Sequence, residues 1–300
     1  MTPVEQVPTV RTDELDGPVV VRFEDLVPGW HEAKCSTEAG FLRWLSPYVG
    51  GPPGHLHEHP ATGLVGVHST MGVMGLLSGQ RQWGVHRHTT TEIYLILRGH
   101  VATVEAGGVS QPMGPMDLLY IPREAPHAVR AVGEEDVLLM YVHDDHERLG
   151  ESRYYADDDP SVQGPDIHPT VVRWNDLEPW WGAPGAGLAG SFNWSVTWAG
   201  GGEGRLNLNP GVAAVGEGCA MGATVIAAAN AQEPERWETV RYLQVVSGRV
   251  SVEGRPDLGV LGAYDVLIVP PGHSHALRAV GLDDATIVWF HEDDGRPLAH

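Results

Sequence analysis

The chain repeats itself, and this repeat constrains its fold more strongly than any other feature of the sequence. VVVRFEDLVPGW at 19–30 matches VVRWNDLEPWW at 171–181. Near the end of each half, GPMDLLYIPREAPHAVRAVG at 114–133 matches GAYDVLIVPPGHSHALRAVG at 262–281. Such self-similarity predicts two successive copies of one structural unit, rather than a single domain of 300 residues.

Both copies have the pattern of short β-strands. Runs rich in Val, Ile, Leu and Tyr are separated by Gly, Pro or Asp, which is typical of strands joined by turns. The 38 glycines and 23 prolines of the chain suit many such turns. Helix is expected only as short turns after the first strand of each copy, FEDL at 23–26 and NDLE at 175–178. The sequence therefore predicts an all-β protein.

The repeat also predicts the domain boundaries. The two domains are expected at 19–146 and 170–294. The acidic, turn-rich segment 147–169 is expected to link them, because it has the composition of a loop. Residues 1–18 are predicted to form a loose polar arm and 295–300 a short tail.

A group of metal-binding residue types lies in the first copy. In GVHRHTTTEIYLILRG at 84–99, His86 and His88 are two residues apart, so a strand places both side chains on one face. Glu92 begins the next strand-like run, and His127 follows downstream. Three imidazoles and one carboxylate suit Fe(II), Mn(II), Co(II), Ni(II), Zn(II) or Cu(II), and the ligand types do not choose among these ions.

The spacing of these residues resembles the two motifs of the cupin superfamily. The matching residues are Gly84, His86, His88, Glu92 and Gly99, then Gly114, Pro122 and His127. Glu124 departs from the pattern, since the second motif usually has a glycine there. The resemblance implies a bicupin, with two tandem jelly-roll β-barrels and one ion inside the first. It also implies that His86, His88, Glu92 and His127 are the metal ligands.

The second copy lacks most of these ligands. Arg241 stands in the place of Glu92, and a guanidinium cannot coordinate a metal. Only His275 is retained, at the place of His127. The places of the other two histidines fall on Glu235 and Trp237 or, one residue later, on Arg236 and Glu238. We therefore expect one divalent metal per chain and a second barrel that kept its fold without a metal site.

Two further residues are candidate catalytic groups. Tyr94 has the same strand parity as Glu92, so it is expected to point into the barrel, where its hydroxyl could orient a substrate or simply be part of the core. His57 lies between His55 and His59, and the second copy has no histidine in the matching segment. This contrast indicates an acid, base or hydrogen-bond donor near the metal, while a polar loop at the rim is the alternative.

Other residues near the motif receive plainer assignments. His143 and His291 occupy matching places in the two copies, which favours a shared structural role. Residues 80–83 come just before the first motif and are expected at the mouth of the barrel. Among them Trp83 is assigned to packing.

The composition limits which partners and which cellular compartment are expected. The formal charge of −20, from 19 basic and 39 acidic residues, would repel nucleic acid and anionic lipid surfaces. Two cysteines make no disulfide framework, and the N-terminus lacks the pattern of a signal peptide. We therefore expect a cytoplasmic protein with a small-molecule substrate, without nucleic-acid or membrane partners. A homodimer is compatible with the resemblance.

Fold does not determine function in this superfamily. We expect a metal-dependent enzyme acting on a small organic substrate, first of all an O2-dependent dioxygenase using Fe(II). Four protein ligands leave open positions on an octahedral ion for a substrate oxygen and for O2. The alternatives are a non-oxidative isomerase, lyase or cyclase at the same site, or a non-catalytic bicupin that binds a ligand.

Overall fold

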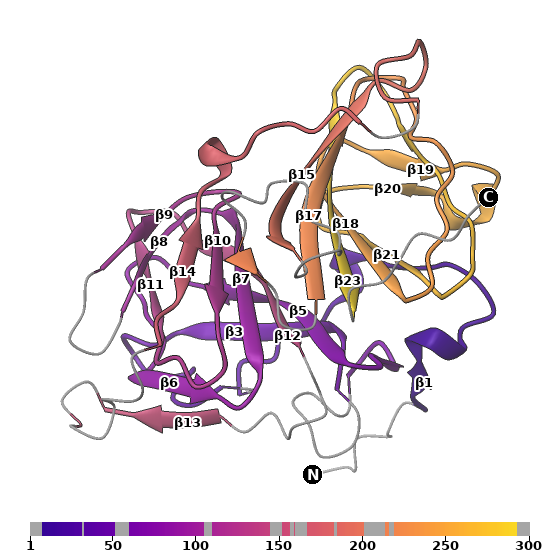
Figure 1. The fold of residues 1–300 in the computed structure, drawn as a ribbon. Coiled ribbons are helices and arrows are strands. Elements are labelled where there is room, and N and C mark those ends of the chain that lie inside the picture. The colour runs from indigo at the N-terminus through magenta and orange to yellow at the C-terminus, as the bar shows by residue number, and fades with distance from the viewer. Residues whose placement is uncertain are drawn as a thin grey trace. The chain divides into compact units, whose positions relative to one another are not determined.

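The computed structural model describes residues 8–31, 33–51, 60–104, 110–144, 152–156, 159, 167–182, 185–200, 214–215 and 219–292. The chain divides into two compact units, the first mainly Leu26–Asn175 and the second Val10–Asp25 with Asp176 onward. Each unit consists of β-sheets, as predicted (Figure 1). No helix in the described part of the chain is long and apolar enough to cross a membrane.

The main sheet of the first unit has the strand order β14-β10-β7-β12-β5-β3, and neighbouring strands are antiparallel. A sheet of order β11-β8-β9 and the pair β13-β6 accompany it. The bounds are β3 Arg43–Val49, β4 Leu64–Val65, β5 Ser69–Leu76, β6 Val85–His88, β7 Thr91–Arg98, β8 His100–Thr103, β9 Pro112–Met113, β10 Leu118–Ile121, β11 Val129–Val132, β12 Val137–Asp144, β13 Ser152–Tyr155 and β14 Thr170–Val172.

The second unit has a main sheet of order β16-β15-β17-β23-β18-β21-β2 and a smaller sheet of order β20-β19-β22. Its strands are β1 Val10–Arg11, β2 Val19–Val21, β15 Asn193–Gly200, β16 Ala214–Val215, β17 Cys219–Ile226, β18 Arg241–Ser247, β19 Val250–Val252, β20 Val260–Leu261, β21 Val266–Val269, β22 Leu277–Ala279 and β23 Ala285–Glu292. The described helices are 3-10 turns, η1 Thr12–Glu14, η2 Phe23–Asp25, η4 Trp174–Asp176 and η5 Pro256–Leu258. Two of them, η2 and η4, lie at the turns expected after the first strands.

The first strands of the two copies are exchanged, which corrects the predicted boundaries. β2 pairs with β21 of the second unit, and β14 pairs with β10 of the first. In each unit, one aspartate holds the end of the exchanged strand by two hydrogen bonds. Asp265 accepts hydrogen bonds from Arg22 Nη1 at 2.8 Å and from the next backbone N–H at 3.0 Å. Asp117 accepts the matching pair from Arg173 Nη1 at 2.9 Å and the N–H after it at 3.0 Å. Because the copies share these residues, the sequence fits either pairing.

The predicted arm and linker also contain ordered structure. Thr12 is buried, and its hydroxyl lies 3.0 Å from the hydroxyl of Tyr242. In the predicted linker, Ser152–Tyr155 forms β13, which pairs antiparallel with β6 of the first barrel. The tail at 295–300 lies outside the described residues. Part of the expected linker is therefore a wall of the first barrel, beside the strand that carries two predicted ligands.

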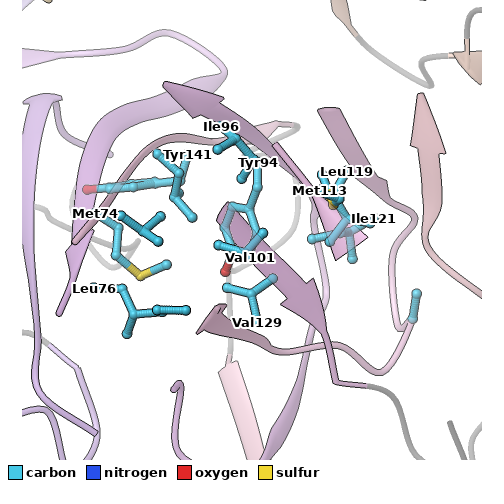
Figure 2. Packing of buried hydrophobic residues seen from close by; sticks show 14 residues of the cluster. Met74, Leu76, Tyr94, Ile96, Val101, Met113, Leu119, Ile121, Val129 and Tyr141 are labelled. Atoms are coloured by element: carbon cyan, nitrogen blue, oxygen red, sulfur yellow. The ribbon is translucent and has the colours of Figure 1, made fainter. Parts of the chain in front are cut away.

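The interior of the first barrel is a cluster of apolar side chains, shown in Figure 2. Met74, Tyr94, Leu119 and Tyr141 come from four neighbouring strands of the main sheet and are almost fully buried. Burying each such side chain contributes roughly 1.5–3 kcal/mol to stability. Tyr94 lies on the inner face with Glu92, as its parity predicted, and Ile96 lies on the same face. The metal-ligand candidates therefore project from a closely packed barrel.

The loop before His127 keeps the shape that glycine normally gives it. Glu124 has a φ of +62°, in the left-handed region, and the matching residue of the second copy is Gly272, with a φ of +75°. The Glu124 N–H donates to the carbonyl of His88 at 2.8 Å. The departure from the motif therefore leaves the loop conformation intact and adds backbone strain.

Candidate metal site

Two neighbouring strand segments bring the four predicted ligands together. β6 carries His86 and His88, and β7 carries Glu92 near its start. His127 reaches the site because its backbone pairs with that of His86 through two N–H···O bonds of 2.9 Å. One ligand atom from each of the four buried side chains lies within 4.8 Å of the others. The sequence motif thus corresponds to one compact donor cluster.

The carboxylate of Glu92 is at the centre of the cluster. Its Oε2 lies 2.6 Å from Nε2 of His127 and 3.1 Å from Nε2 of His88. Its Oε1 lies 3.1 Å from Nε2 of His143. The carboxylate therefore has histidine nitrogens close to both of its oxygens.

Two of the histidines are oriented by bonds at their other ring nitrogen. Nδ1 of His127 donates to the carbonyl oxygen of Ala125 at 2.9 Å, which fixes the ring with Nε2 directed at the Glu92 carboxylate. Nδ1 of His88 lies 2.9 Å from the hydroxyl of Ser152. Nε2 of His88 is buried and makes no hydrogen bond of acceptable geometry, and the same is true of Nδ1 of His86. Such convergent, unsatisfied nitrogens fit a divalent metal.

The electrostatics of the cluster also fit metal binding. Burial lowers the pKa of His86 well below its ordinary value and that of His88 to about 4, although Glu92 opposes the shift at both residues. Burial alone would raise the pKa of Glu92, but His143, His88 and His127 hold it well below its ordinary value. At neutral pH His86 and His88 are therefore neutral and the Glu92 carboxylate is ionised, which are the states that coordinate metals.

The cluster opens onto a cavity of about 190 Å³ in the first unit. Tyr94 lines this cavity, and burial followed by the charge of Glu92 raises the pKa of its hydroxyl well above the ordinary value. Gln82 donates to the Tyr94 hydroxyl at 3.0 Å and accepts from the N–H of Val129 at 2.8 Å. Tyr94 is thus held protonated and in a fixed orientation beside the predicted ligands.

Several residues of the cavity were missed or undervalued from the sequence. They are Lys34, Arg43, His143, Ser152 and Tyr154. His143 was assigned a structural role, yet it faces both the cavity and Glu92. Tyr154 stacks on the ring of His86 at 4.8 Å between centroids and 14° between planes. The aromatic pair in SRYY was the available signal for a strand in the acidic linker. His57, the second catalytic candidate, lies outside the described residues.

The second unit shows what replaced the ligands. Glu235 forms with His275 the same backbone bridge that His86 forms with His127, so the first of the two alignments is correct. Arg241 pairs with His291 in register as Glu92 pairs with His143, and it forms an ion pair with Glu235. Burial lowers the pKa of Arg241 only to about 9, so it is charged at neutral pH. A fixed positive charge therefore occupies the place of the Glu92 carboxylate.

The comparisons with known proteins agree with the fold. Residues 72–143 match the family model of the cupin domain. No curated protein sequence matches the chain significantly. The salicylate 1,2-dioxygenase of Pseudaminobacter salicylatoxidans is similar in structure, with a TM-score of 0.67 and 15% identity over 99% of this chain and 91% of that chain. The oxalate decarboxylase of Bacillus subtilis, which has Mn(II) centres, is also similar in structure. Its TM-score is 0.58, with 16% identity over 94% of this chain and 79% of that chain.

Residues 72–143, in the first unit, match a cupin domain. The chain as a whole, with its two β units, is similar in fold to these two enzymes. At such low identity, the likeness to the two enzymes concerns the fold alone.

Proposed function

We propose that the chain is a metal-dependent enzyme acting on a small organic substrate, and that its reaction is an O2-dependent oxygenation. The observation that carries this proposal is the buried cluster of His86, His88, Glu92 and His127 at the wall of a cavity. When bound there, a redox-active divalent ion such as Fe(II) supplies Lewis acidity and electrons for O2. The dioxygenase among the structural neighbours makes oxygenation the first reaction to test.

The other residues of the cavity have defined tasks in this proposal. Tyr94 accepts a hydrogen bond from Gln82 and keeps its own proton, so it can donate that proton to a substrate oxygen. Leu45 and Met74 give the cavity apolar walls that limit access of water. We therefore assign to Tyr94 the role of orienting the substrate.

A non-oxidative reaction at the same site is the second candidate. A Lewis-acid isomerase, lyase or cyclase would use the same four ligands, and one of the structural neighbours is a decarboxylase with Mn(II). Such an enzyme has no need of a metal that changes its oxidation state. The two candidates therefore differ in what happens when O2 or the redox-active metal is withdrawn.

The test is an O2-uptake screen of the Fe(II)-loaded and Zn(II)-loaded protein with enolisable and catechol-like compounds. We expect turnover with Fe(II) in air and none with Zn(II), because zinc has no accessible redox step. Product should also be absent from the Fe(II) protein under nitrogen until O2 is admitted. Full activity of the zinc form under nitrogen would refute oxygenation and favour the Lewis-acid alternative.

The role of Tyr94 needs a separate variant. Tyr94→Phe removes only the hydroxyl, so the metal content should stay at the wild-type level while kcat falls by about 10- to 1,000-fold. His275→Ala is the control, since it removes a buried histidine of the second barrel. Unchanged kcat in Tyr94→Phe would contradict the assignment.

A further inference from the structure

A buried arginine lies in the cavity of the candidate metal site. Arg43 begins β3, is 2% exposed and lines the same cavity as His86 and Glu92. Its Nη1 donates to Sδ of Met74 at 3.8 Å, and its Nη2 donates to the hydroxyl of Tyr154 at 3.4 Å. Its Nε is buried and makes no hydrogen bond. The guanidinium therefore has two weak contacts with neutral groups.

Such an arrangement is costly unless an anion completes it. A guanidinium stays protonated in proteins, and removing it from water without a partner is strongly unfavourable. Three other buried or half-buried arginines have carboxylate partners. Arg241 pairs with Glu235, Arg22 with Asp265 and Arg173 with Asp117. Arg43 differs from these three because its planar fork of donors is available to a ligand in the cavity.

The second barrel provides an internal comparison. Asn193 begins β15 as Arg43 begins β3, and each pairs with the last residue of the following long strand, Ile226 or Leu76. Asn193 is neutral, and its amide donates to the carbonyl of Ser191 at 2.8 Å. The arginine is therefore present in the barrel with the metal-ligand set and absent from the barrel that lost it. A purely structural role in the repeated fold would not require this difference.

The charges of the cavity indicate what kind of molecule fits. A divalent ion, the Glu92 carboxylate and the Arg43 guanidinium together leave two uncompensated positive charges. Lys34 adds a further cation on the lining of the cavity, with its ammonium 3.7 Å above the ring of Trp83. The cavity of about 190 Å³ is smaller than the roughly 300–1,000 Å³ of drug-sized ligand sites. A small organic anion with two acidic oxygens matches both the charge and the size.

We propose that the substrate is a small organic acid whose carboxylate binds to Arg43, with Tyr154 beside it, while a second ionisable oxygen reaches the metal. This rests on the proposed metal-dependent function of the same cavity and adds the substrate class. Arg43 would hold the carboxylate by two parallel N–H···O bonds, which a lysine cannot reproduce. The acid is then fixed at both ends, with its second oxygen directed at the cluster around Glu92.

The test measures binding without turnover. Co(II)- or Zn(II)-loaded protein under nitrogen is titrated with salicylate, lactate and pyruvate, each against its neutral amide, by calorimetry and, for cobalt, by the visible spectrum. We expect at least one acid to bind at least about 30-fold more tightly than its amide. Arg43→Met should abolish that preference, and Arg43→Lys should restore only part of it. Arg130→Met, an exposed arginine of β11, should behave as wild type.

The thermal stability of Arg43→Met distinguishes an arginine that binds a ligand from one that supports the fold. Replacing an unpaired buried charge by an apolar side chain of similar length should keep or raise the melting temperature of Arg43→Met, with metal content unchanged. The inference is overturned if Arg43→Met binds the acids as tightly as wild type, or if no tested acid is preferred over its amide. Binding is measured without turnover, so this test does not depend on oxygenation. If an acid binds to Arg43 but causes no O2 uptake with Fe(II), only the proposed oxygenation is refuted.

Discussion

Replacing Glu124 by glycine is expected to stabilise the first barrel. Glu124 has a φ of +62°, and its side chain makes no hydrogen bond or ion pair with another residue of the described ranges that would offset the strain. A non-glycine residue in this region costs about 1–2 kcal/mol. Glycine removes that cost but loses about 0.5–1 kcal/mol through the greater freedom of the unfolded chain. The net gain should be about 0.5–1 kcal/mol.

The second barrel supplies the matched control for this change. Gly272 is the equivalent residue, with a φ of +75°, and a Cβ built there meets nothing within 4 Å. Gly272→Glu should therefore destabilise by a similar amount through the backbone alone. For a unit of this size, such changes correspond to shifts in melting temperature of about 1–4 °C. Scanning calorimetry and urea unfolding of both variants measure them.

A lower melting temperature for Glu124→Gly, or a higher one for Gly272→Glu, would contradict backbone strain at residue 124. Metal content should be the same in Glu124→Gly as in wild type, because the backbone bond from residue 124 to His88 is retained. Loss of metal from this variant would mean that the Glu124 side chain supports the site in a way that its contacts do not explain.

Two further predictions concern the cavity wall and the second barrel. Gly84 has a φ of +60°, and a Cβ there would overlap the carbonyl oxygen of Tyr155, so Gly84→Ala should displace β13 and destabilise by at least about 2 kcal/mol. Gly79→Ala, with a φ of +70° and open space around the Cβ, is its control and should cost only about 1 kcal/mol in urea unfolding. Burial, followed by the charge of Arg241, lowers the pKa of His275 from 6.5 to about 3. The unfolded chain therefore takes up a proton first, and the stabilising contribution, complete above pH 6.5, is lost as pH falls toward 3. At pH 5 the loss is about 2 kcal/mol, and His275→Gln should remove it from the difference between urea unfolding at pH 7.5 and pH 5. An unchanged pH dependence in that variant would contradict the neutral, buried state of His275.

The ligand cluster was predictable from strand parity together with the resemblance to the cupin motifs. Strand parity places His86 and His88 on one face, and the resemblance implied that Glu92 and His127 join them, as they do in the 4.8 Å cluster. The replacement of Glu92 by Arg241 was visible because the repeat allows one copy to be read against the other. Each of these predictions depends on residues close in sequence, on the resemblance to a known motif or on a direct internal comparison.

The features that were missed depend on long-range packing. The exchange of β2 and β14 could not be predicted, because the two copies offer the same partner strand and the same aspartate anchor. β13 is a short strand in an acidic segment, and its pairing with β6 is specified by tertiary contacts. Arginine is usually an exposed residue type, so the sequence gives no sign that Arg43, at the start of a strand, is buried in the folded barrel.

The number of metal ions per chain tests the central claim most directly. Elemental analysis of fully loaded protein should give one ion per chain in wild type and in His275→Ala. His86→Ala and Glu92→Ala should each give a ratio near zero, because they remove ligands of the buried cluster in the first barrel. A ratio of two in wild type, or full metal retention by both first-barrel variants, would contradict a single metal site formed by His86, His88, Glu92 and His127.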